Sequence, residues 1–221
     1  MNSILLIGNS GGIGHALQGA LEARGASVTG LSRRDTGLDL NDEASVEGQL
    51  SALSGPFDAI LVASGALEIN GARPEKALSQ LTQSAFLDQF IVNAAGPALI
   101  LKHAPRLLPK DRPSQFAALS ARVGSIGDNK IGGWYSYRAA KAALNQIIHT
   151  GAIELARTHK QAVCVALHPG TVQTPFTAKY LGRHPSVPAS QAALNLLSVL
   201  EGLGPDKTGQ FFDWAGKPVP W

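Results

Sequence analysis

Short apolar runs alternate along the chain with longer segments in which apolar residues recur every three or four positions. The apolar runs predict strands buried on both faces, and they lie at 4–7, 26–31, 57–63, 116–120, 162–168 and 210–213. The segments with helical spacing predict helices at 13–24, 41–53, 75–91, 93–109, 136–159 and 189–200. This repeated order predicts an α/β fold with a doubly wound parallel sheet.

The segment between the second predicted strand and Asp39 is unusually short. Its sequence, RRDTG, cannot form a crossover helix of ordinary length, so we expect one helix to be missing at this point. The 221 residues contain no repeat, low-complexity tract or linker that would divide the chain. One domain that spans residues 1–221 is therefore expected.

The composition is that of a compact protein, because 44% of the residues are hydrophobic and 16% are charged, which suits one large core. The net charge is only +3 and the basic residues are scattered, so we expect no nucleic-acid partner. Cys164 is the only cysteine, which excludes an intramolecular disulfide and favours a cytoplasmic location.

No membrane-spanning segment or signal peptide is expected. The first apolar run is short and has no basic flank before it. The longest apolar stretches are interrupted by Gly96, Pro97, Lys102 and Pro105, whereas a membrane helix needs about 20 apolar residues. The histidines and the single cysteine show no metal-ligand spacing, so we also expect no metal site.

A glycine-rich loop follows the first predicted strand directly and opens a helix. Gly8 allows a tight turn, and Gly12 and Gly14 lack the Cβ atoms that would keep the backbone away from the phosphates of a ligand. The first turn of the helix then directs its N–H groups at a pyrophosphate. An ordinary glycine-rich turn is the alternative, but the place of the loop after the first strand favours a dinucleotide site in a Rossmann fold.

The end of the second predicted strand, LSRR, indicates which dinucleotide is bound. An NAD-specific site usually has an acidic residue here, which accepts a hydrogen bond from the ribose 2′-hydroxyl. This chain has Ser32 followed by Arg33 and Arg34, whose guanidinium groups can pair with a 2′-phosphate. NADP(H) is therefore preferred. Two alternatives stay open: the nearby Asp35 would allow NAD(H), and the arginines could be solvated surface residues.

Tyr137 and Lys141 are four residues apart in a predicted helix, so they lie on one face about one turn from each other. A lysine ammonium stabilises a phenolate and lowers the tyrosine pKa, which would make Tyr137 a usable acid or base near neutral pH. Tyr135 lies on another side of the helix and is the weaker candidate. Taken alone, such a pair is more often a feature of a helix surface than of an active site.

Several further motifs accompany this pair. Together they comprise Gly8, Gly12 and Gly14, Asp39, the sequence Ala63-Ser64-Gly65, Asn93, Tyr137 with Lys141, and Pro169-Gly170 followed by Thr174. In this order and spacing they resemble the short-chain dehydrogenase/reductase family over almost the whole chain, although that family usually has Asn-Ala-Gly at 63–65. The stretches SARVGSIGDN, GGWYSYRAAKAALN, HPGTVQTPF and GQFFDWAGKPVPW look most like the C-factor-like subgroup.

The resemblance implies an oxidoreductase that interconverts a carbonyl and a secondary alcohol by hydride transfer. Tyr137 would be the general acid or base, Lys141 would lower its pKa and hold the nicotinamide ribose, and Asn93 would hold a water of a proton relay. The adenine would lie at Asp39 and Leu40. The remaining cofactor contacts would come from Gly8, Ser10, Gly12, Ile13, Gly14, Ser32, Arg33, Arg34, Ala63, Ser64, Gly65, Pro169, Gly170, Val172 and Thr174.

The chain departs from this family at the catalytic serine, which usually lies three residues before a glycine. Here Gly124 points to Ala121. The neighbouring Ser120 is the candidate replacement, although successive strand residues face opposite sides, and Ser125 is a second candidate. Loss of one such donor costs about 10² to 10³ in rate. The alternative function is therefore a weakly active or non-catalytic NADP(H)-binding sensor or signalling protein.

Three further expectations concern the surroundings of this site. The segment 176–188 is expected to form part of a lid over the substrate, a small carbonyl or alcohol compound that the sequence leaves unidentified. His168 is expected to be hydrogen-bonded scaffold rather than a base. The helices 84–109 and 136–159 carry many small residues, and the resemblance implies a homodimer or homotetramer through them.

Overall fold

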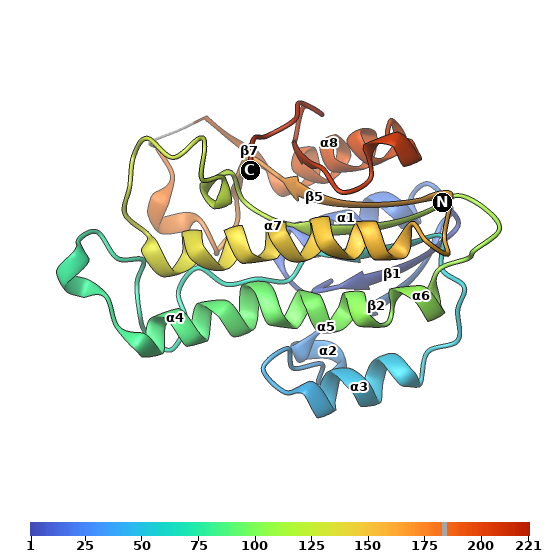
Figure 1. The fold of residues 1–221 in the computed structure, drawn as a ribbon, viewed down its shortest axis with the longest axis horizontal. Helices are drawn as coiled ribbons and strands as arrows, with labels where there is room; N and C mark the ends of the chain where they lie inside the picture. Colours follow the sequence, from blue (N-terminus) through green and yellow to red (C-terminus); the bar gives the residue numbers. More distant parts are fainter. Residues whose placement is uncertain (183–184) are drawn as a thin grey trace.

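The strands of the central sheet run parallel in the computed structural model, as the apolar runs predict (Figure 1). The described residues, 1–182 and 185–221, form a sheet of six strands in the order β2-β1-β3-β4-β5-β8. The strands are β1 (Ser3–Ile7), β2 (Ser27–Leu31), β3 (Ala59–Val62), β4 (Ser114–Leu119), β5 (Ala162–His168) and β8 (Phe211–Asp213). An unpredicted ribbon of β6 (Thr171–Gln173) and β7 (Ser186–Pro188) is separate from this sheet.

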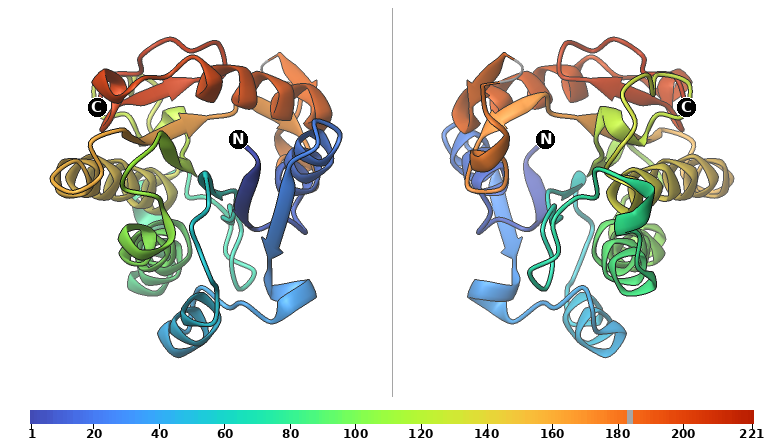
Figure 2. Two further views of the ribbon diagram at one scale, coloured as in Figure 1. Left: turned by 90° about the vertical axis from the view of Figure 1, so that its right-hand side faces the viewer. Right: turned by 90° about the vertical axis from the view of Figure 1, so that its left-hand side faces the viewer.

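Helices cover both faces of the sheet, which confirms the doubly wound α/β fold (Figure 2). Helices α1 and α8 pack against each other on one face, and α4, α5 and α7 form the layer on the other face. Their bounds are α1 (Gly12–Glu22), α3 (Glu43–Ser51), α4 (Gln83–Phe90), α5 (Gly96–Lys102), α6 (Ala104–Leu107), α7 (Tyr135–Leu155) and α8 (Ala189–Glu201).

Strand β1 shows why its sequence is a continuous apolar run. Leu5 and Ile7 belong to the core cluster on the side of α5 and α7, whereas Ile4 and Leu6 belong to the cluster on the side of α1 and α8. All four side chains are fully buried. Alternate residues of a strand point to opposite faces, so a sheet covered on both sides needs apolar residues at every position.

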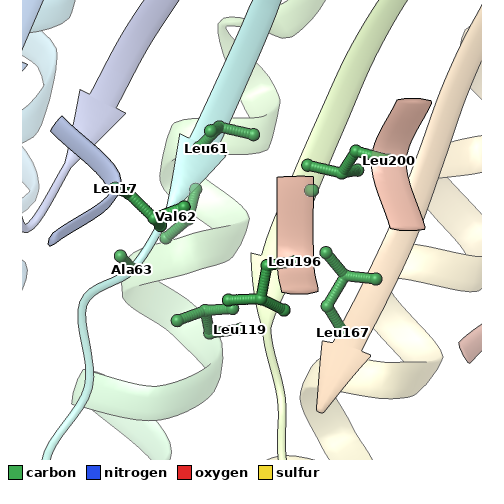
Figure 3. A pocket seen from close by; sticks show the side chains of 9 residues that line it. Leu17, Leu61, Val62, Ala63, Leu119, Leu167, Leu196 and Leu200 are labelled. Atoms are coloured by element: carbon green, nitrogen blue, oxygen red, sulfur yellow. The ribbon is translucent and has the colours of Figure 1, made fainter. Parts of the chain in front are cut away.

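A small apolar void lies between the sheet and helices α1 and α8 (Figure 3). Leucine side chains from the sheet and from both helices line it, and its volume is about 10 Å³. A cavity needs roughly 10 to 15 Å³ and polar partners to hold even one water molecule. The void is therefore a feature of core packing and not a ligand site.

The helix predicted at 75–91 starts later than expected, at Gln83, and it runs directly into the next one. One π-helical turn, Ile91–Ala95, joins α4 to α5. Gly96 and Pro97 lie inside the continuous helix, as the helix predicted at 93–109 implies. The π turn already disrupts the α-helical hydrogen bonds at the place where Pro97 has no N–H to donate.

This long helix bears on the expected absence of a membrane span. The segment Gln83–Lys102 has a mean hydropathy of 1.3 and is, by length and composition alone, long and apolar enough to cross a membrane. Of that stretch, 39% is buried inside the domain, where it packs against α7. Core helices of soluble proteins meet the same criterion, so this composition is weak evidence for a span.

The connection after β2 confirms the expected missing crossover helix. Only the four-residue helix α2 (Arg33–Thr36) forms there, and the chain then passes to α3. No strand lies between β2 and Asp39, and β2 is at the edge of the six-stranded sheet. The short connection leaves the end of β2 and its two arginines close to the surface.

Candidate active site

The predicted site residues meet at the edge of the sheet where the parallel strands end. Gly8 follows β1, Ser32 follows β2, Ala63 follows β3 and Pro169 follows β5. Strands β1 and β3 are neighbours in the sheet, and the chain passes from β1 to β2 on one side and from β3 to β4 on the other, so the connections after β1 and β3 run in opposite directions. Such a switch point is where open α/β sheets bind ligands.

The glycine loop after β1 is packed so tightly that side chains cannot be added to it. Gly8 has a φ of 86°, and a Cβ there would lie 2.8 Å from the backbone nitrogen of Ser64. A Cβ on Gly14 would lie 2.1 Å from the carbonyl oxygen of Gly8. The N-cap of α1 is Gly11, which has no side chain to bind the first N–H groups of the helix. The loop and the helix start therefore form a cradle that suits a pyrophosphate.

Two buried polar atoms near this loop strengthen the fit. Among the described residues, Ser64 Oγ and Asn9 Oδ1 have no hydrogen-bond partner. Asn9 is held only through its Nδ2, which donates to Gln18 Oε1 at 3.1 Å. Buried polar atoms without partners are rare in native proteins and usually indicate an unseen water, ion or ligand. The residues at this position therefore fit a dinucleotide.

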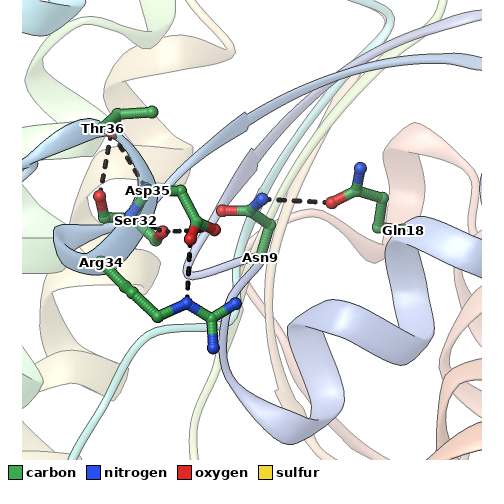
Figure 4. A network of polar contacts seen from close by, with 6 residues as sticks. All are labelled: Asn9, Gln18, Ser32, Arg34, Asp35 and Thr36. Carbon is green, nitrogen blue, oxygen red and sulfur yellow. Dashed lines mark hydrogen bonds and ion pairs between the residues drawn. The ribbon is translucent and has the colours of Figure 1, made fainter.

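The residues expected to distinguish NADP from NAD form a network at the end of β2 (Figure 4). The Ser32 hydroxyl accepts from Asp35 N at 3.2 Å and donates to Asp35 Oδ2 at 3.1 Å. Arg34 Nε donates to Asp35 Oδ1 at 2.9 Å, and this contact is the main reason that the pKa of Asp35 is lowered. Arg33 is exposed and, in the described part of the chain, has no carboxylate at ion-pair distance. The Asp35 carboxylate is thus engaged by Ser32 and Arg34, and the guanidinium group of Arg33 is available to a ligand.

The segment after β5 lies against the glycine loop, which brings two predicted contacts together. A Cβ on Gly12 would lie 2.6 Å from Thr174 Cγ2. Gly170 has a φ of 79°, and a Cβ there would lie 3.0 Å from Trp214 Cδ1. Val172, by contrast, is buried in the small ribbon. The segment that follows β5 therefore packs closely against the start of α1, next to the glycine loop.

Asp39 and Leu40, expected at the adenine, lie beside α5. Asp39 Oδ1 accepts from the backbone nitrogen of Asn41 at 3.0 Å and from its Nδ2 at 2.7 Å, and these bonds lower the Asp39 pKa. A Cβ on Gly96 would lie 2.8 Å from Leu40 Cβ. The contact of Asp39 and Leu40 with adenine stays a prediction.

Tyr137 and Lys141 lie buried on one face of α7. Lys141 Nζ donates to the Leu119 carbonyl oxygen at 2.9 Å and lies 5.8 Å from the centroid of the Tyr137 ring. Burial lowers the pKa of Lys141 to about 7 and raises the pKa of Tyr137. The expected lowering of the Tyr137 pKa is therefore wrong for this arrangement. The cost of desolvating a phenolate outweighs its attraction to an amine that is itself partly neutral at pH 7.

Asn93 lies in the π turn and is fully buried. Its Oδ1 accepts from Ala66 N at 3.1 Å, and its Nδ2 donates to Ala66 O at 2.8 Å and to Gln89 Oε1 at 2.7 Å. A Cβ on Gly65 would lie 2.9 Å from Asn93 Oδ1 and 3.6 Å from Lys141 Nζ. The structure thus brings Asn93, Gly65 and Lys141 together. The side-chain amide is used to hold the loop after β3, so the role of Asn93 in a water relay stays a prediction.

The two candidate serines lie on either side of Ala121, and both are buried. Ser120 Oγ donates to Asn145 Oδ1 on α7 at 2.6 Å. Ser125 Oγ accepts from the backbone nitrogen of Asp128 at 3.1 Å. The Ser120 hydroxyl proton is therefore already engaged in this structure, and a contact between either serine and substrate stays a prediction.

The remaining predictions near the site have mixed outcomes. His168 Nδ1 is buried and has no hydrogen-bond partner among the residues described, which is contrary to the expected hydrogen-bonded scaffold. Burial lowers the His168 pKa to about 4, so this ring is neutral at pH 7. Of the expected lid, 176–188, the positions Arg183 and His184 lie outside the described residues.

Comparison with known proteins agrees with this geometry. The family model described as enoyl-(acyl carrier protein) reductase matches residues 7–199, which is most of the chain. The chain belongs to the short-chain dehydrogenase/reductase family.

Three similar proteins show how far this family membership extends. The 1-hydroxy-2-glutathionyl-2-methyl-3-butene dehydrogenase of a Rhodococcus species is 29% identical over the whole of both chains. C-signal of Myxococcus xanthus is 35% identical over 66% of this chain and 84% of its own length. A protein of Burkholderia multivorans, described as a short-chain dehydrogenase/reductase with bound NADP, has a TM-score of 0.83 and 26% identity over 100% of this chain and 99% of its own.

Several residues of this short-chain dehydrogenase/reductase site could not be found from the sequence. Gln89 Oε1 accepts a hydrogen bond from Asn93 Nδ2, and the only sequence signal for this contact was that Gln89 lies one helical turn before Asn93. Trp134 lies directly before α7 in a left-handed conformation, with φ 54° and ψ 42°, which costs a residue with a side chain about 1 to 3 kcal/mol. Its backbone N–H donates to the carbonyl oxygen of the buried Glu75 at 2.5 Å. No local motif indicates this pairing.

Proposed function

We propose that this protein is an NADP(H)-dependent oxidoreductase that interconverts a carbonyl and a secondary alcohol, with Tyr137 as general acid and base. The observation that carries the proposal is the buried pair of Tyr137 and Lys141, which lies beside Gly65 and Asn93 at the carboxyl edge of the sheet. Family membership supports it, because the named relatives include a dehydrogenase over the full chain.

The residues of the chain have separable tasks in this reaction. NADP(H), when bound, supplies or accepts the hydride. The Tyr137 hydroxyl gives its proton to the substrate carbonyl oxygen in reduction and takes it back in oxidation. Lys141, whose pKa is about 7, can hold or release a proton near neutral pH and so can exchange protons with Tyr137 and solvent. The network of Asn93, Ala66 and Gln89 fixes the loop after β3 against this pair.

NADP(H) is the proposed cofactor, and NAD(H) is proposed as a less favoured alternative cofactor. The glycine cradle and the orphaned Ser64 and Asn9 atoms support a dinucleotide. The exposed Arg33 supports a 2′-phosphate, and the engagement of Asp35 by Arg34 argues against a free ribose-binding carboxylate. The similar Burkholderia multivorans protein with bound NADP supports the same choice.

The test is NADPH consumption with a panel of aldehydes, ketones, quinones and diones. The variants are Tyr137→Phe and, as a matched control on the same helix, Tyr135→Phe. Loss of a positioned acid or base lowers turnover by about 10² to 10⁴, so Tyr137→Phe should lose turnover by that factor while Tyr135→Phe keeps it. Equal activity in wild type and Tyr137→Phe would refute the assignment.

A second candidate function is a non-catalytic or weakly active NADP(H)-binding sensor. Ala121 stands where the family has its serine, and the Ser120 hydroxyl is bound to Asn145, which favours this alternative. Tight NADPH binding without turnover of any compound of the panel, and with the same NADPH affinity in Tyr137→Phe, would support the sensor.

The proposed assembly is a homodimer or homotetramer through α4 and α7, which pack side by side in one layer (Figure 1). Leu87, Phe90 and Ile153 are about half exposed on these two helices, and a second copy would cover them. Light scattering should give the mass of a dimer or tetramer for wild type and a lower mass for Phe90→Asp. The cytoplasm is the proposed location, which the single buried cysteine supports.

A further inference from the structure

Two aromatic rings flank Tyr137, and they come from separate segments. The Trp134 ring lies 6.2 Å from the Tyr137 ring, centroid to centroid, at an interplanar angle of 67°. The Phe176 ring lies 6.3 Å from it at 59°. A third ring, Tyr180, lies 5.2 Å from Trp134 at 71°. A substrate whose carbonyl oxygen reaches the Tyr137 hydroxyl therefore approaches through an aromatic environment.

The backbone holds Trp134 in this place at the cost of a strained conformation. Its left-handed turn is tied to Glu75, whose carbonyl oxygen accepts from Trp134 N and whose Oε2 accepts from Ser136 N at 3.3 Å. Glu75 is buried, and its Oε1 has no partner among the described residues. Strain that is held in place by surrounding contacts clusters at ligand-binding sites. The strained turn is thus consistent with a binding role for the indole.

The segment that carries the other ring, Phe176, is tied to the loop after β3 by an ion pair. Lys179 Nζ lies 2.6 Å from Glu68 Oε2, and the Tyr180 hydroxyl donates to Glu68 Oε1 at 2.9 Å. Glu68 belongs to the loop after β3, more than a hundred residues away, so these bonds fasten the segment that carries Phe176 across the site. Phe176 itself is 41% exposed, which leaves part of the ring free to contact a ligand.

We propose that the substrate carries a planar aromatic ring next to its carbonyl group, and that Trp134 and Phe176 hold this ring on either side of Tyr137. The inference rests on the proposed oxidoreductase function and adds its substrate class. Ala121 supports it, because a methyl group replaces the family's hydrogen-bond donor and leaves more of the substrate binding to ring contacts. Aromatic rings in offset or edge-to-face contact attract each other beyond the effect of buried area.

The experiment compares acetophenone with cyclohexyl methyl ketone, which share the acetyl group and a six-membered ring but differ in planarity. Steady-state NADPH oxidation is measured for wild type, for Phe176→Leu, which keeps apolar bulk, and for Leu194→Ala as a control at an exposed apolar residue on α8. Wild type should favour acetophenone by about tenfold in kcat/KM. Phe176→Leu should remove this preference, mainly through a higher KM for acetophenone, and Leu194→Ala should keep it.

The outcomes separate this inference from the function on which it rests. Turnover of both ketones without an aromatic preference, or a preference that survives Phe176→Leu, would overturn the substrate class and leave the oxidoreductase function in place. Absence of turnover with these ketones and with the whole carbonyl panel would overturn both. A Trp134→Leu variant that folds, by circular dichroism, and loses the same preference would add support from the second ring.

Discussion

Replacement of Arg33 by alanine should weaken NADPH binding while leaving NADH binding nearly unchanged. Arg33 is exposed at the end of β2 and, within the described residues, is not engaged by a carboxylate, so its guanidinium is available for a 2′-phosphate. A hydrogen bond to a charged group contributes about 1.5 to 3 kcal/mol, and 1.4 kcal/mol corresponds to a factor of ten. The KM for NADPH should therefore rise by about 10- to 150-fold.

The assay compares KM values for NADPH and NADH in wild type, Arg33→Ala and Arg157→Ala. Arg157 is exposed beyond the end of α7, so its removal makes the same change in net charge away from the cofactor site. An equal rise in the KM for NADPH in Arg33→Ala and Arg157→Ala would mean that the arginines act only through long-range attraction between their charge and the cofactor. An equal rise in KM for NADPH and NADH in Arg33→Ala would refute the assignment to the 2′-phosphate.

Arg34 should respond differently from Arg33, because its side chain is already engaged by Asp35 (Figure 4). Its Nε is already bound to Asp35 at 2.9 Å. In Arg34→Ala the Asp35 carboxylate loses this partner and becomes able to accept from a ribose 2′-hydroxyl. The variant should therefore lower the KM for NADH as well as raise that for NADPH, and an unchanged KM for NADH would contradict this account.

Ala121→Ser should raise kcat by about 10- to 100-fold if the chain is an enzyme that lacks one donor, and unchanged turnover would count against this explanation. The free energy of unfolding of the wild type should rise by about 2 kcal/mol relative to that of Lys141→Met between pH 7 and pH 9. The reason is that the lowered pKa lets Lys141 lose its proton in the folded state at a lower pH than in the unfolded state. Urea unfolding of both proteins at the two pH values measures this difference. Glu75→Ala should lower the free energy of unfolding by about 1 to 3 kcal/mol, because Ser136 N loses its acceptor, and Glu75→Gln, which keeps an acceptor oxygen, should lose less.

The sequence was most informative where one residue type satisfies a purely local requirement. The continuous apolar run of β1 follows from burial on both faces, and the glycines at 8 and 14 follow from a loop that admits no Cβ. The short RRDTG connection was equally direct, because chain length alone excludes a normal crossover helix. These features depend on few residues near one another in the chain.

Features that depend on tertiary contacts could not be predicted. The spacing of apolar residues at 75–82 resembles that of a helix. In the structure, the Glu75 carbonyl oxygen instead accepts a hydrogen bond from Trp134 N at the start of α7, and the helix begins only at Gln83. The π turn requires the pairing of Asn93 with Ala66, which is 27 residues away. Spacing also placed Tyr137 beside Lys141 correctly, but it carried no information about burial and therefore gave the wrong direction for the tyrosine pKa.

That burial also bears on the direction of the proposed reaction. Because the pKa of Tyr137 is raised, its hydroxyl is protonated at neutral pH, which is the form that carbonyl reduction consumes. Alcohol oxidation would need the phenolate, which the buried site disfavours. Lys141, with a pKa of about 7, is available in its charged form at the same pH to return a proton to Tyr137 after each reduction. The buried pair therefore supplies the proton that carbonyl reduction consumes at neutral pH, and the rate of reduction should fall as the pH rises and Lys141 loses its proton.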